Sequence, residues 1–529
     1  MEVEVEVEVE VEVEVEVEVE VEVEVEAGGD PQMDKLASDH SPFPGVQEYM
    51  KASQGQWRLS AQSRVRIVDN VRSDGNRVLN DTIFIILSEY ADSLAPSGHL
   101  LSVLYGECET PSSGDIVIEL NDSGAGGGMD SREGYVIEIG EYVHITAPSE
   151  TAVMYGLRTV IQTLVTDSFM PYGRITEYPV MPERALHIDI GRKFYTAEWI
   201  MERIREMSRL RLNTLQLHFS ENEGFRLMSE SHPEVMSDEY LTKQEMKAII
   251  HTAARYHIAV IPSLDSPGHL GQALRTHPDW LLKNSAGAVA PGALDITNAA
   301  ARQFMLELID EYAELFAGST HFHIGGDEFI NFGQFGEYPQ LEQYARDVLN
   351  IGGGTGVDTY IDYLNGVAEH LESKGWIVRA WNDGLYRGDQ IQRITPKSSI
   401  QITYWTKWHE MMAPVEEIIA QGHQVINFND AYFYYVLGEH AGYTYPTGEK
   451  ICNSWHPGLF PQRSGGAKQE YPAGSYPREL IGCSFSIWSD KPEAQTEAEV
   501  AVGIRGPLSA MAERAWLGKQ KLAGYAEFI

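Results

Sequence analysis

The sequence predicts an α/β protein in which a small α+β domain precedes a larger domain of alternating strands and helices. After Pro182, eight short apolar runs recur, and helical patterns follow most of them. Before Pro182, strand-like runs separated by Gly, Ser and Asp precede one helical pattern. Eight strands with alternating helices fit a (β/α)8 barrel, a TIM barrel. A doubly wound open sheet is the alternative, but no Gly-rich phosphate motif follows the first strand.

The chain divides into three parts. Residues 1–55 form a leader and a polar linker, which begin with Met1 and a strict Glu-Val alternation through residue 26. We interpret this low-complexity run as a tag or a disordered leader and exclude it from the fold. Residues 56–181 form a non-catalytic α+β domain, and residues 182–529 form the barrel. Because the Glu-Val run hides the native N-terminus, both a cytoplasmic and a secreted location stay open.

The smaller domain combines short strands with one helix. A helix is expected from about Glu150 to Leu164, where Val153, Leu157, Val160 and Leu164 share one face. The expected strands are Val65–Val68, Thr82–Leu87, Ile116–Leu120, Tyr135–Ile139 and His144–Thr146.

The barrel strands are the eight apolar runs. They are Ala185–Ile190, Thr214–Phe219, Ala259–Leu264, His321–Ile324, Ile377–Trp381, Ser399–Tyr404, Gln424–Phe428 and Ile481–Ile487. Helices are expected at Glu198–Arg211, Lys243–Tyr256, Ala299–Phe316, Asp358–Ser373, Pro414–Ala420 and Glu497–Trp516. Three units are irregular: the fifth connection has at most a turn, the sixth only a short helix, and the seventh is a long loop rich in Tyr, Gly and Pro.

Composition excludes several classes of partner. The net charge is −38, and removing the 13 glutamates of the leader leaves −25, so the surface repels nucleic acid. No stretch approaches the length of a membrane span. Three cysteines, widely separated, imply no disulfide framework. No cofactor is expected, and the oligomeric state is left open.

The fourth barrel strand ends in a pair of acids. His321-Phe322-His323-Ile324 alternates as a strand, two glycines follow, and then Asp327 and Glu328 stand together. Active sites of such barrels lie at the carboxyl ends of the strands. Because like charges held close together do not both ionise easily, one acid of such a pair is suited to donate a proton near neutral pH.

Other strand ends supply groups that suit a neutral sugar. Strands five, six and eight each deliver a tryptophan at their carboxyl end, and Arg192 follows Asp189 after strand one. Indole faces stack on pyranose rings, and Arg and carboxylates hydrogen-bond hydroxyl groups. The tryptophans are Trp381, Trp405 and Trp488.

A metal-dependent hydrolase is a rival interpretation. Five histidines near the strands could join Asp327 around an ion, namely His187, His218, His269, His321 and His323. However, only His321 and His323 share a strand, and a tryptophan-lined pocket has no use in such a site. No metal is therefore expected.

Taken in order, the motifs resemble those of family 20 glycoside hydrolases, the β-N-acetylhexosaminidases. They are Asp-Ile-Gly-Arg (189–192), Leu-His-Phe-Ser (217–220), Asp-Ser-Pro-Gly-His (265–269), His-Ile-Gly-Gly-Asp-Glu (323–328) and Trp-Asn-Asp-Gly (381–384). The similarity looks closest to the bacterial, dispersin-like branch. The smaller domain is similar to the family's usual non-catalytic N-terminal domain.

The resemblance implies exo-acting, retaining removal of terminal β-linked N-acetylglucosamine or N-acetylgalactosamine through an oxazolinium intermediate. Glu328 would be the general acid/base, and Asp327 would orient the substrate's acetamido group. Tyr432, or less favourably Tyr434, would hydrogen-bond the acetamido oxygen, and His269 would pair with Glu328.

Substrate-binding roles follow in the same way. Arg192 would hold the C3 and C4 hydroxyls. The remaining substrate-binding residues would be Glu221, Trp381, Asp383, Trp405 and Trp488. Glu221-Asn222 departs from the Asp-Asp or Asp-His of many relatives, and Asn331 stands where dispersin-like enzymes place an aromatic residue. A non-catalytic carbohydrate-binding barrel is the alternative of another class.

Overall fold

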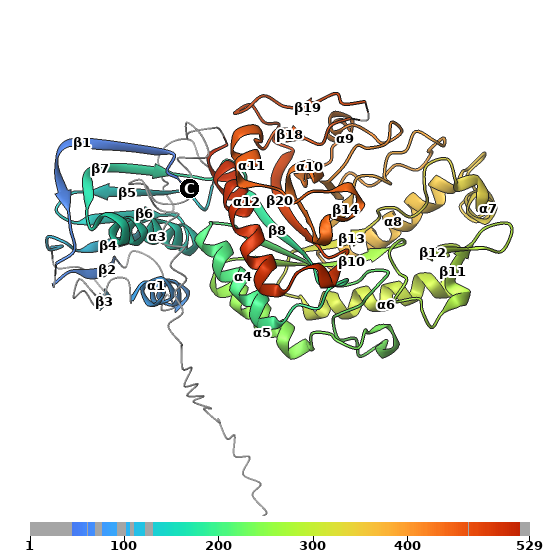
Figure 1. Ribbon diagram of the computed structural model, residues 1–529, viewed down its shortest axis with the longest axis horizontal. Coiled ribbons are helices and arrows are strands. Elements are labelled where there is room, and N and C mark those ends of the chain that lie inside the picture. Colours follow the sequence, from blue (N-terminus) through green and yellow to red (C-terminus); the bar gives the residue numbers. More distant parts are fainter. Residues whose placement is uncertain are drawn as a thin grey trace, which may run out of the picture. The chain divides into compact units, whose positions relative to one another are not determined.

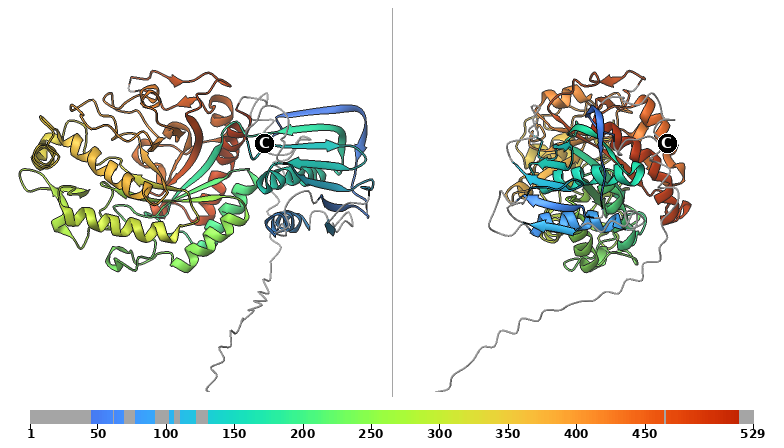
Figure 2. Two further views of the ribbon diagram at one scale, coloured as in Figure 1. Left: turned by 180° about the vertical axis from the view of Figure 1, so that it is seen from behind. Right: turned by 90° about the vertical axis from the view of Figure 1, so that its left-hand side faces the viewer.

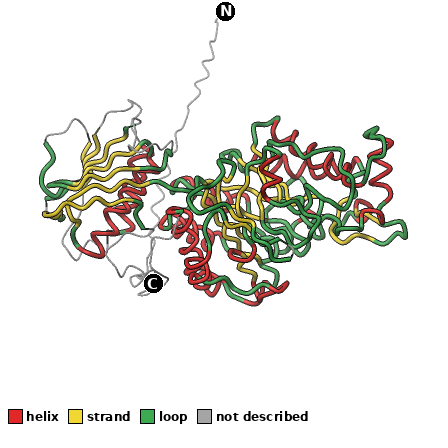
Figure 3. Tube along the Cα trace, turned by 90° about the horizontal axis from the view of Figure 1, so that it is seen from above, coloured by secondary structure: helices red, strands yellow, loops and turns green. Residues whose placement is uncertain are grey.

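The computed structural model describes residues 45–60, 62–68, 77–91, 102–105, 110–121, 131–463 and 465–518. The Glu-Val leader therefore lies outside the described residues. The strands form two separate groups, one in each domain (Figure 3). Within the described residues, no helix has the length and apolar character that a membrane span requires.

The smaller domain is a mixed sheet with helix α3 (Glu150–Asp167) packed on β5, β6 and β7, and α1 (Arg77–Glu89) packed beside α3 (Figure 1). Its strand order is β1-β7-β5-β6-β4-β2-β3. The strands are β1 (Glu48–Trp57), β2 (Arg64–Val68), β3 (Ser102–Tyr105), β4 (Ile116–Leu120), β5 (Tyr135–Ile139), β6 (Val143–Ala147) and β7 (Met170–Glu177).

Two expectations for this region are wrong in detail. The run Thr82–Leu87 lies inside helix α1 and is not a strand: Leu79, Ile83 and Ile86 are buried, whereas Phe84 is exposed. That spacing is helical, and a short apolar run alone does not separate the two structures. The expected linker also overlaps β1, an edge strand whose side chains are mostly exposed and therefore show no apolar alternation.

The larger domain is a closed barrel of eight parallel strands, as predicted. The strands are β8 (Glu183–Asp189), β9 (Thr214–His218), β10 (Ala259–Ser266), β13 (His321–Gly325), β14 (Ile377–Trp381), β15 (Gln401–Tyr404), β16 (Val425–Asn427) and β20 (Leu480–Trp488). Neighbours pair in parallel around the ring, and β20 closes it by pairing with both β16 and β8. Each predicted strand is present, with ends that differ by two residues at most.

Helices lie on the outside of these strands (Figure 2). They are α4 (Ala197–Arg209), α5 (Lys243–Arg255), α6 (Ala299–Leu315), α8 (Gly356–Glu372), α9 (Val415–Ala420) and α12 (Glu497–Leu517), all predicted. Side-chain oxygens of Thr196, Thr242, Asn298 and Thr496 cap the first turns of α4, α5, α6 and α12. The capping residues therefore define where each of these helices begins.

The connections after the third, fourth and seventh barrel strands contain short elements that the sequence did not predict. They are the hairpin β11 (Leu281–Lys283) and β12 (Val289–Leu294), α7 (Pro339–Asp347), α10 (Asp430–Phe433), β17 (Tyr434–Val436), α11 (Gly448–Ser454), and the pair β18 (Leu459–Phe460) and β19 (Gln469–Glu470). Strand β17 pairs in parallel with the end of β20, so that Tyr434 lies opposite Ser486. The loop predicted after strand seven is thus anchored at the barrel mouth.

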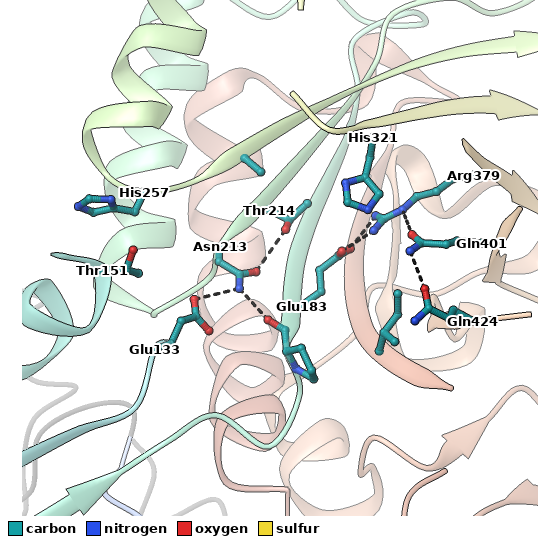
Figure 4. Close-up of a pocket in the computed structure, with 13 residues that line it drawn as sticks. Glu133, Thr151, Glu183, Asn213, Thr214, His257, His321, Arg379, Gln401 and Gln424 are labelled. Carbon is teal, nitrogen blue, oxygen red and sulfur yellow. Dashed lines mark hydrogen bonds and ion pairs between the residues drawn. The ribbon is translucent and has the colours of Figure 1, made fainter. Parts of the chain in front are cut away.

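The amino ends of the strands surround a hollow of about 420 Å³ (Figure 4). Several of its polar groups are paired with one another. Arg379 donates to both oxygens of Glu183 at 2.8 and 2.5 Å and to Gln401 at 2.9 Å, and Gln401 donates to Gln424. Because this end of a barrel normally serves stability, we interpret the network as structural.

Candidate active site

The carboxyl ends of the barrel strands surround a second cavity, of about 370 Å³. Eight residues selected from the sequence line it: Arg192, Glu221, His269, Asp327, Glu328, Trp381, Trp405 and Trp488. They come from the ends of seven different strands. Only closure of the barrel brings them together.

The acid pair follows β13 in a constrained backbone. Gly325 has φ +75°, and a Cβ there would lie 2.7 Å from Asp265, so no larger residue fits. Glu328 has φ +46°, a conformation that is strained for a residue with a side chain. Its N–H donates to Asp383 Oδ2 at 2.9 Å. This hydrogen bond supports a backbone shape that leaves the Glu328 side chain 50% exposed at the cavity.

His269 connects the two acids. Its Nε2 lies 3.3 Å from Asp327 Oδ2 and 3.4 Å from Glu328 Oε2, and its Nδ1 lies 3.0 Å from Glu221 Oε2. Burial lowers the pKa of His269, but the charges of Glu221 and Asp327 raise it well above its usual value. The imidazole is therefore a cation held against both acids.

Glu221 is the centre of a buried ion-pair network. Besides His269, it contacts Arg192 Nη2 at 2.7 Å and His218 Nε2 at 3.2 Å, and it accepts the Asn222 N–H at 2.9 Å. Burial by itself raises the pKa of Glu221, yet His269 and Arg192 lower it well below the usual range. The glutamate at this position therefore does support His269.

Arg192 is fixed by three carboxylates. It lies 2.9 Å from Asp189, 2.7 Å from Glu221 and 3.3 Å from Glu223. Its guanidinium is 5.6 Å from the centre of the Trp488 ring. Because these contacts define its orientation, Arg192 is pre-organised to bind hydroxyl oxygens.

Aromatic rings form the cavity wall. Trp405 and Tyr434 are parallel, with ring centres 5.8 Å apart and 1° between their planes. Trp488 lies 5.7 Å from Tyr434 and 6.0 Å from Trp381. Trp381 is almost fully buried, so it contributes to the barrel core as well as to the floor.

The negative charge of Asp327 affects two neighbouring carboxyl groups, those of Asp383 and Asp265. Burial and then the charge of Asp327 raise the pKa of Asp383 to about 7. The same two causes raise the pKa of Asp265 well above its usual value. Crowded carboxylates in an enclosed site are typical of glycosidase chemistry.

Comparison with known proteins agrees with this geometry. The family model described as "Glycosyl hydrolase family 20, catalytic domain" matches residues 182–519. The chain belongs to this family.

Individual family 20 relatives are distant. A lacto-N-biosidase of Bifidobacterium bifidum is 26% identical over 386 residues, which cover 73% of this chain and 33% of that protein. A beta-hexosaminidase 1 of Coccidioides posadasii is 24% identical over 341 residues, covering 58% and 54%. The chain thus spans a third and about half of the length of these two curated relatives.

A solved structure, the beta-N-acetylhexosaminidase of Bacteroides fragilis, shares the fold with a TM-score of 0.69. Its sequence is 20% identical, and the match covers 90% of this chain and 91% of that one. The predicted barrel and the predicted family are confirmed.

Two predicted site residues of this family 20 domain lie elsewhere. Tyr432 does not line the cavity: it sits in the short helix α10, with Lys450 Nζ 4.8 Å from its ring centre. Tyr434 lines the cavity instead, because β17 pairs with β20. Asp383 does not line it either, since its two oxygens accept from the Glu328 N–H and from Trp405 Nε1 at 3.0 Å.

Six lining residues were not selected from the sequence. They are Trp408, Asp430, Val436, Ala441, Tyr443 and Asp490. Asp430 and Asp490 directly follow strands seven and eight, so the rule that found Asp327 also applies to them. Tyr443 and Ala441 lie in the long connection before β20, where no periodic pattern marks them.

The five histidines named for the rival metal site lie at different places in the barrel. His187, His218 and His323 lie inside the barrel, whereas His321 lies at its other end, beside the structural hollow. Among the described residues, His218, Glu221 and Asp265 bring their ligand atoms within 4.8 Å of one another. In the structure, His218 turns Nε2 to Glu221 and Nδ1 to Asp265, so these groups pair with each other.

Proposed function

We propose that this chain is an exo-acting β-N-acetylhexosaminidase that hydrolyses terminal β-linked N-acetylglucosamine or N-acetylgalactosamine with retention. The observation that carries the proposal is the pair Asp327 and Glu328 on one histidine nitrogen, at 3.3 and 3.4 Å. A protein nucleophile and an acid must act on opposite faces of the sugar. Two acids that share one nitrogen lie on the same side, so the substrate's own acetamido oxygen is the better nucleophile.

Asp327 suits the task of holding that acetamido group. Its Oδ1 is buried and has no hydrogen-bond partner, so it is free to accept the acetamido N–H. The Tyr434 hydroxyl is the donor for the acetamido oxygen, since burial raises its pKa well above the usual value and keeps it protonated. Together these contacts set the oxygen for attack on C1.

The reaction has two steps. In the first, the acetamido oxygen bonds to C1 while the bond from C1 to the leaving oxygen breaks, and Glu328 gives that oxygen a proton. In the second, Glu328 takes a proton from water, and the hydroxide opens the oxazolinium at C1. Asp327 stabilises the positive charge that develops on the acetamido nitrogen between the steps.

The other lining residues define the sugar pocket and its mouth. Arg192 and Asp490 bind ring hydroxyls, and Trp405 and Trp488 cover the ring faces. Trp408 is 53% exposed at the rim and offers a face for the leaving group. The smaller domain supplies none of the lining residues, which supports a non-catalytic role for residues 56–181.

Release of aryl alcohol from an aryl β-N-acetylglucosaminide tests the proposal. Hydrolysis is expected, with the same aryl glycoside of glucose nearly inert because it lacks the acetamido nucleophile. Asp327→Asn should lower kcat by orders of magnitude with a modest change in KM, since the interaction strengthens in the transition state. A 2-fluoro sugar that traps a covalent adduct on any carboxylate would contradict the mechanism. No release at any pH would favour a carbohydrate-binding protein.

Release of a disaccharide is the second candidate, because the relative with 26% identity is named a lacto-N-biosidase. Arg192 argues against it here. If the guanidinium holds the 3- and 4-hydroxyls, a second sugar on either oxygen would collide with a side chain that three carboxylates fix. Aryl glycosides of lacto-N-biose and of N-acetylglucosamine, compared side by side, distinguish the two. The placement in a bacterial, dispersin-like branch stays a prediction.

A further inference from the structure

His218 has no role in the mechanism above, yet it lies directly beneath the site. It is the last residue of β9 and is fully buried. Its ring centre is 5.3 Å from that of Trp488, which lines the cavity, and 5.6 Å from that of His187. It therefore lies between the barrel core and the functional residues.

Both nitrogens of His218 face a carboxylate. Nε2 lies 3.2 Å from Glu221 Oε1, and Nδ1 lies 3.7 Å from Asp265 Oδ1 and 3.3 Å from Ser263 Oγ. A neutral imidazole has one N–H and one lone pair, so it would turn a lone pair towards one of the acids. The Nδ1 lone pair of a neutral ring can accept the Ser263 hydroxyl, but only the imidazolium presents an N–H to both carboxylates.

The charged groups around His218 come from several elements. They are Glu221 after β9, Asp265 on β10, Asp189 and His187 on β8, and His323 on β13. Burial lowers the pKa of His218, but Asp265, Glu221 and Asp189 outweigh it and raise the pKa to about 9. Burial and the neighbouring cations lower the pKa of both His187 and His323, so these two rings stay neutral.

We propose that His218 is a positioning residue that is protonated at neutral pH beneath the active site. It holds Glu221 from the core side, while Arg192 and His269 hold the same carboxylate from the cavity side. It also favours the ionised form of Asp265, against the burial and the Asp327 charge that raise the pKa of this carboxyl, whose oxygens are buried without a hydrogen bond. The proposal deepens the proposed function and depends on it for its kinetic consequences.

Loss of this charge has a defined effect. Without the imidazolium, Asp265 and Glu221 repel Asp327, so the acids of the site ionise less readily. Glu221 also loses one of the contacts that fix its orientation, and Arg192 and His269 are then less well placed. Activity should therefore fall, and its pH dependence should change shape.

His218→Asn tests this, with His321→Asn as the matched control. His321 is another histidine on a barrel strand, but it is only partly buried and lies at the other end of the barrel. Burial and the charge of Arg379 lower its pKa to about 4. The kcat/KM of His218→Asn should fall about 10- to 100-fold, as when an outer partner of a functional group is removed. The acid limb of its pH profile should move up by about one pH unit or more. The control should match wild type in both.

Nitrogen chemical shifts of the histidine rings report the charge directly. In protein labelled with ¹⁵N-histidine, the pair of ring signals missing from His218→Asn should be that of a protonated imidazole at pH 7. The pair missing from His321→Asn should be that of a neutral ring. A neutral His218 at pH 7 would overturn the proposal, as would a loss of activity with an unshifted acid limb in a variant that melts like wild type.

Asp265→Asn completes the design. The double variant combines His218→Asn with Asp265→Asn. If the two residues are coupled, it should recover part of the shift that His218→Asn causes in the acid limb, and the effects of the two substitutions on kcat/KM should be less than additive. Full additivity would contradict the coupling. If the wild-type protein cleaves no β-N-acetylhexosaminide, the proposed function fails, but the nitrogen shifts still decide the charge of His218.

Discussion

Replacing Tyr434 by Phe tests which tyrosine serves the acetamido group. The change removes one hydroxyl and leaves the ring, which is 5% exposed and held between Trp405 and Trp488 at 5.8 and 5.7 Å. Packing is therefore preserved, and the effect reports the lost hydrogen bond. Tyr432→Phe is the matched control, since this ring lies outside the cavity two residues away.

The magnitude follows from the environment of the hydroxyl. Leaving a buried acceptor unpaired costs about 1–3 kcal/mol, which corresponds to about 5- to 150-fold in kcat/KM. Because Tyr434 places the acetamido oxygen for attack, most of the loss should be in kcat. Tyr432→Phe should change kcat/KM less than about twofold, since its ring does not line the cavity.

Steady-state kinetics on an aryl β-N-acetylglucosaminide measure both variants, and thermal melting checks that both are folded. The reasoning is refuted if Tyr432→Phe is the impaired variant and Tyr434→Phe is not. It is also refuted if Tyr434→Phe raises KM alone, because the hydroxyl would then bind the ground state without positioning the nucleophile.

Three further predictions concern the acids and the arginine. Glu328→Gln should lose about 10²–10⁴-fold on disaccharides and much less on activated aryl glycosides, which need little protonation; equal losses would remove Glu328 from the acid role. Arg192→Ala should raise KM and lower kcat together, and unchanged kinetics in a folded variant would place Arg192 outside substrate binding. Asp383 has a raised pKa of about 7, so the folded state binds its proton more tightly than the unfolded chain does, and this contribution to stability is lost as pH rises from about 4 to 7. Asp383→Asn should flatten that part of the unfolding free energy measured against pH. It should also lower kcat, because one of the two oxygens that accept from the Glu328 N–H and from Trp405 Nε1 becomes an NH2 group, which cannot accept. An unchanged pH dependence would contradict the assignment.

The sequence alone determined the barrel and the family. Strands of a parallel barrel are buried on both faces, so each one is a short apolar run that ends abruptly in polar residues. Those ends carry the chemistry, which is why Arg192, Glu221, His269, Asp327 and Glu328 could all be selected from their places after the apolar runs. The sequence pattern did not reveal β1, whose side chains are mostly exposed. It was ambiguous for α1, because a short apolar run fits a helix as well as a strand.

Tertiary structure decided which side chains face the cavity. Tyr432 and Tyr434 look alike in sequence, and only the pairing of β17 with β20 turns Tyr434 inward. Asp383 is two residues after Trp381 in sequence, yet it does not line the cavity, because its carboxylate accepts hydrogen bonds from the Glu328 N–H and from Trp405 Nε1. Trp408 and Tyr443 reach the cavity from irregular segments that no periodicity marks, and His218 meets Asp265 only because β9 and β10 are neighbours in the barrel. Side-chain direction at a strand end depends on contacts with distant segments, and local sequence does not encode those contacts.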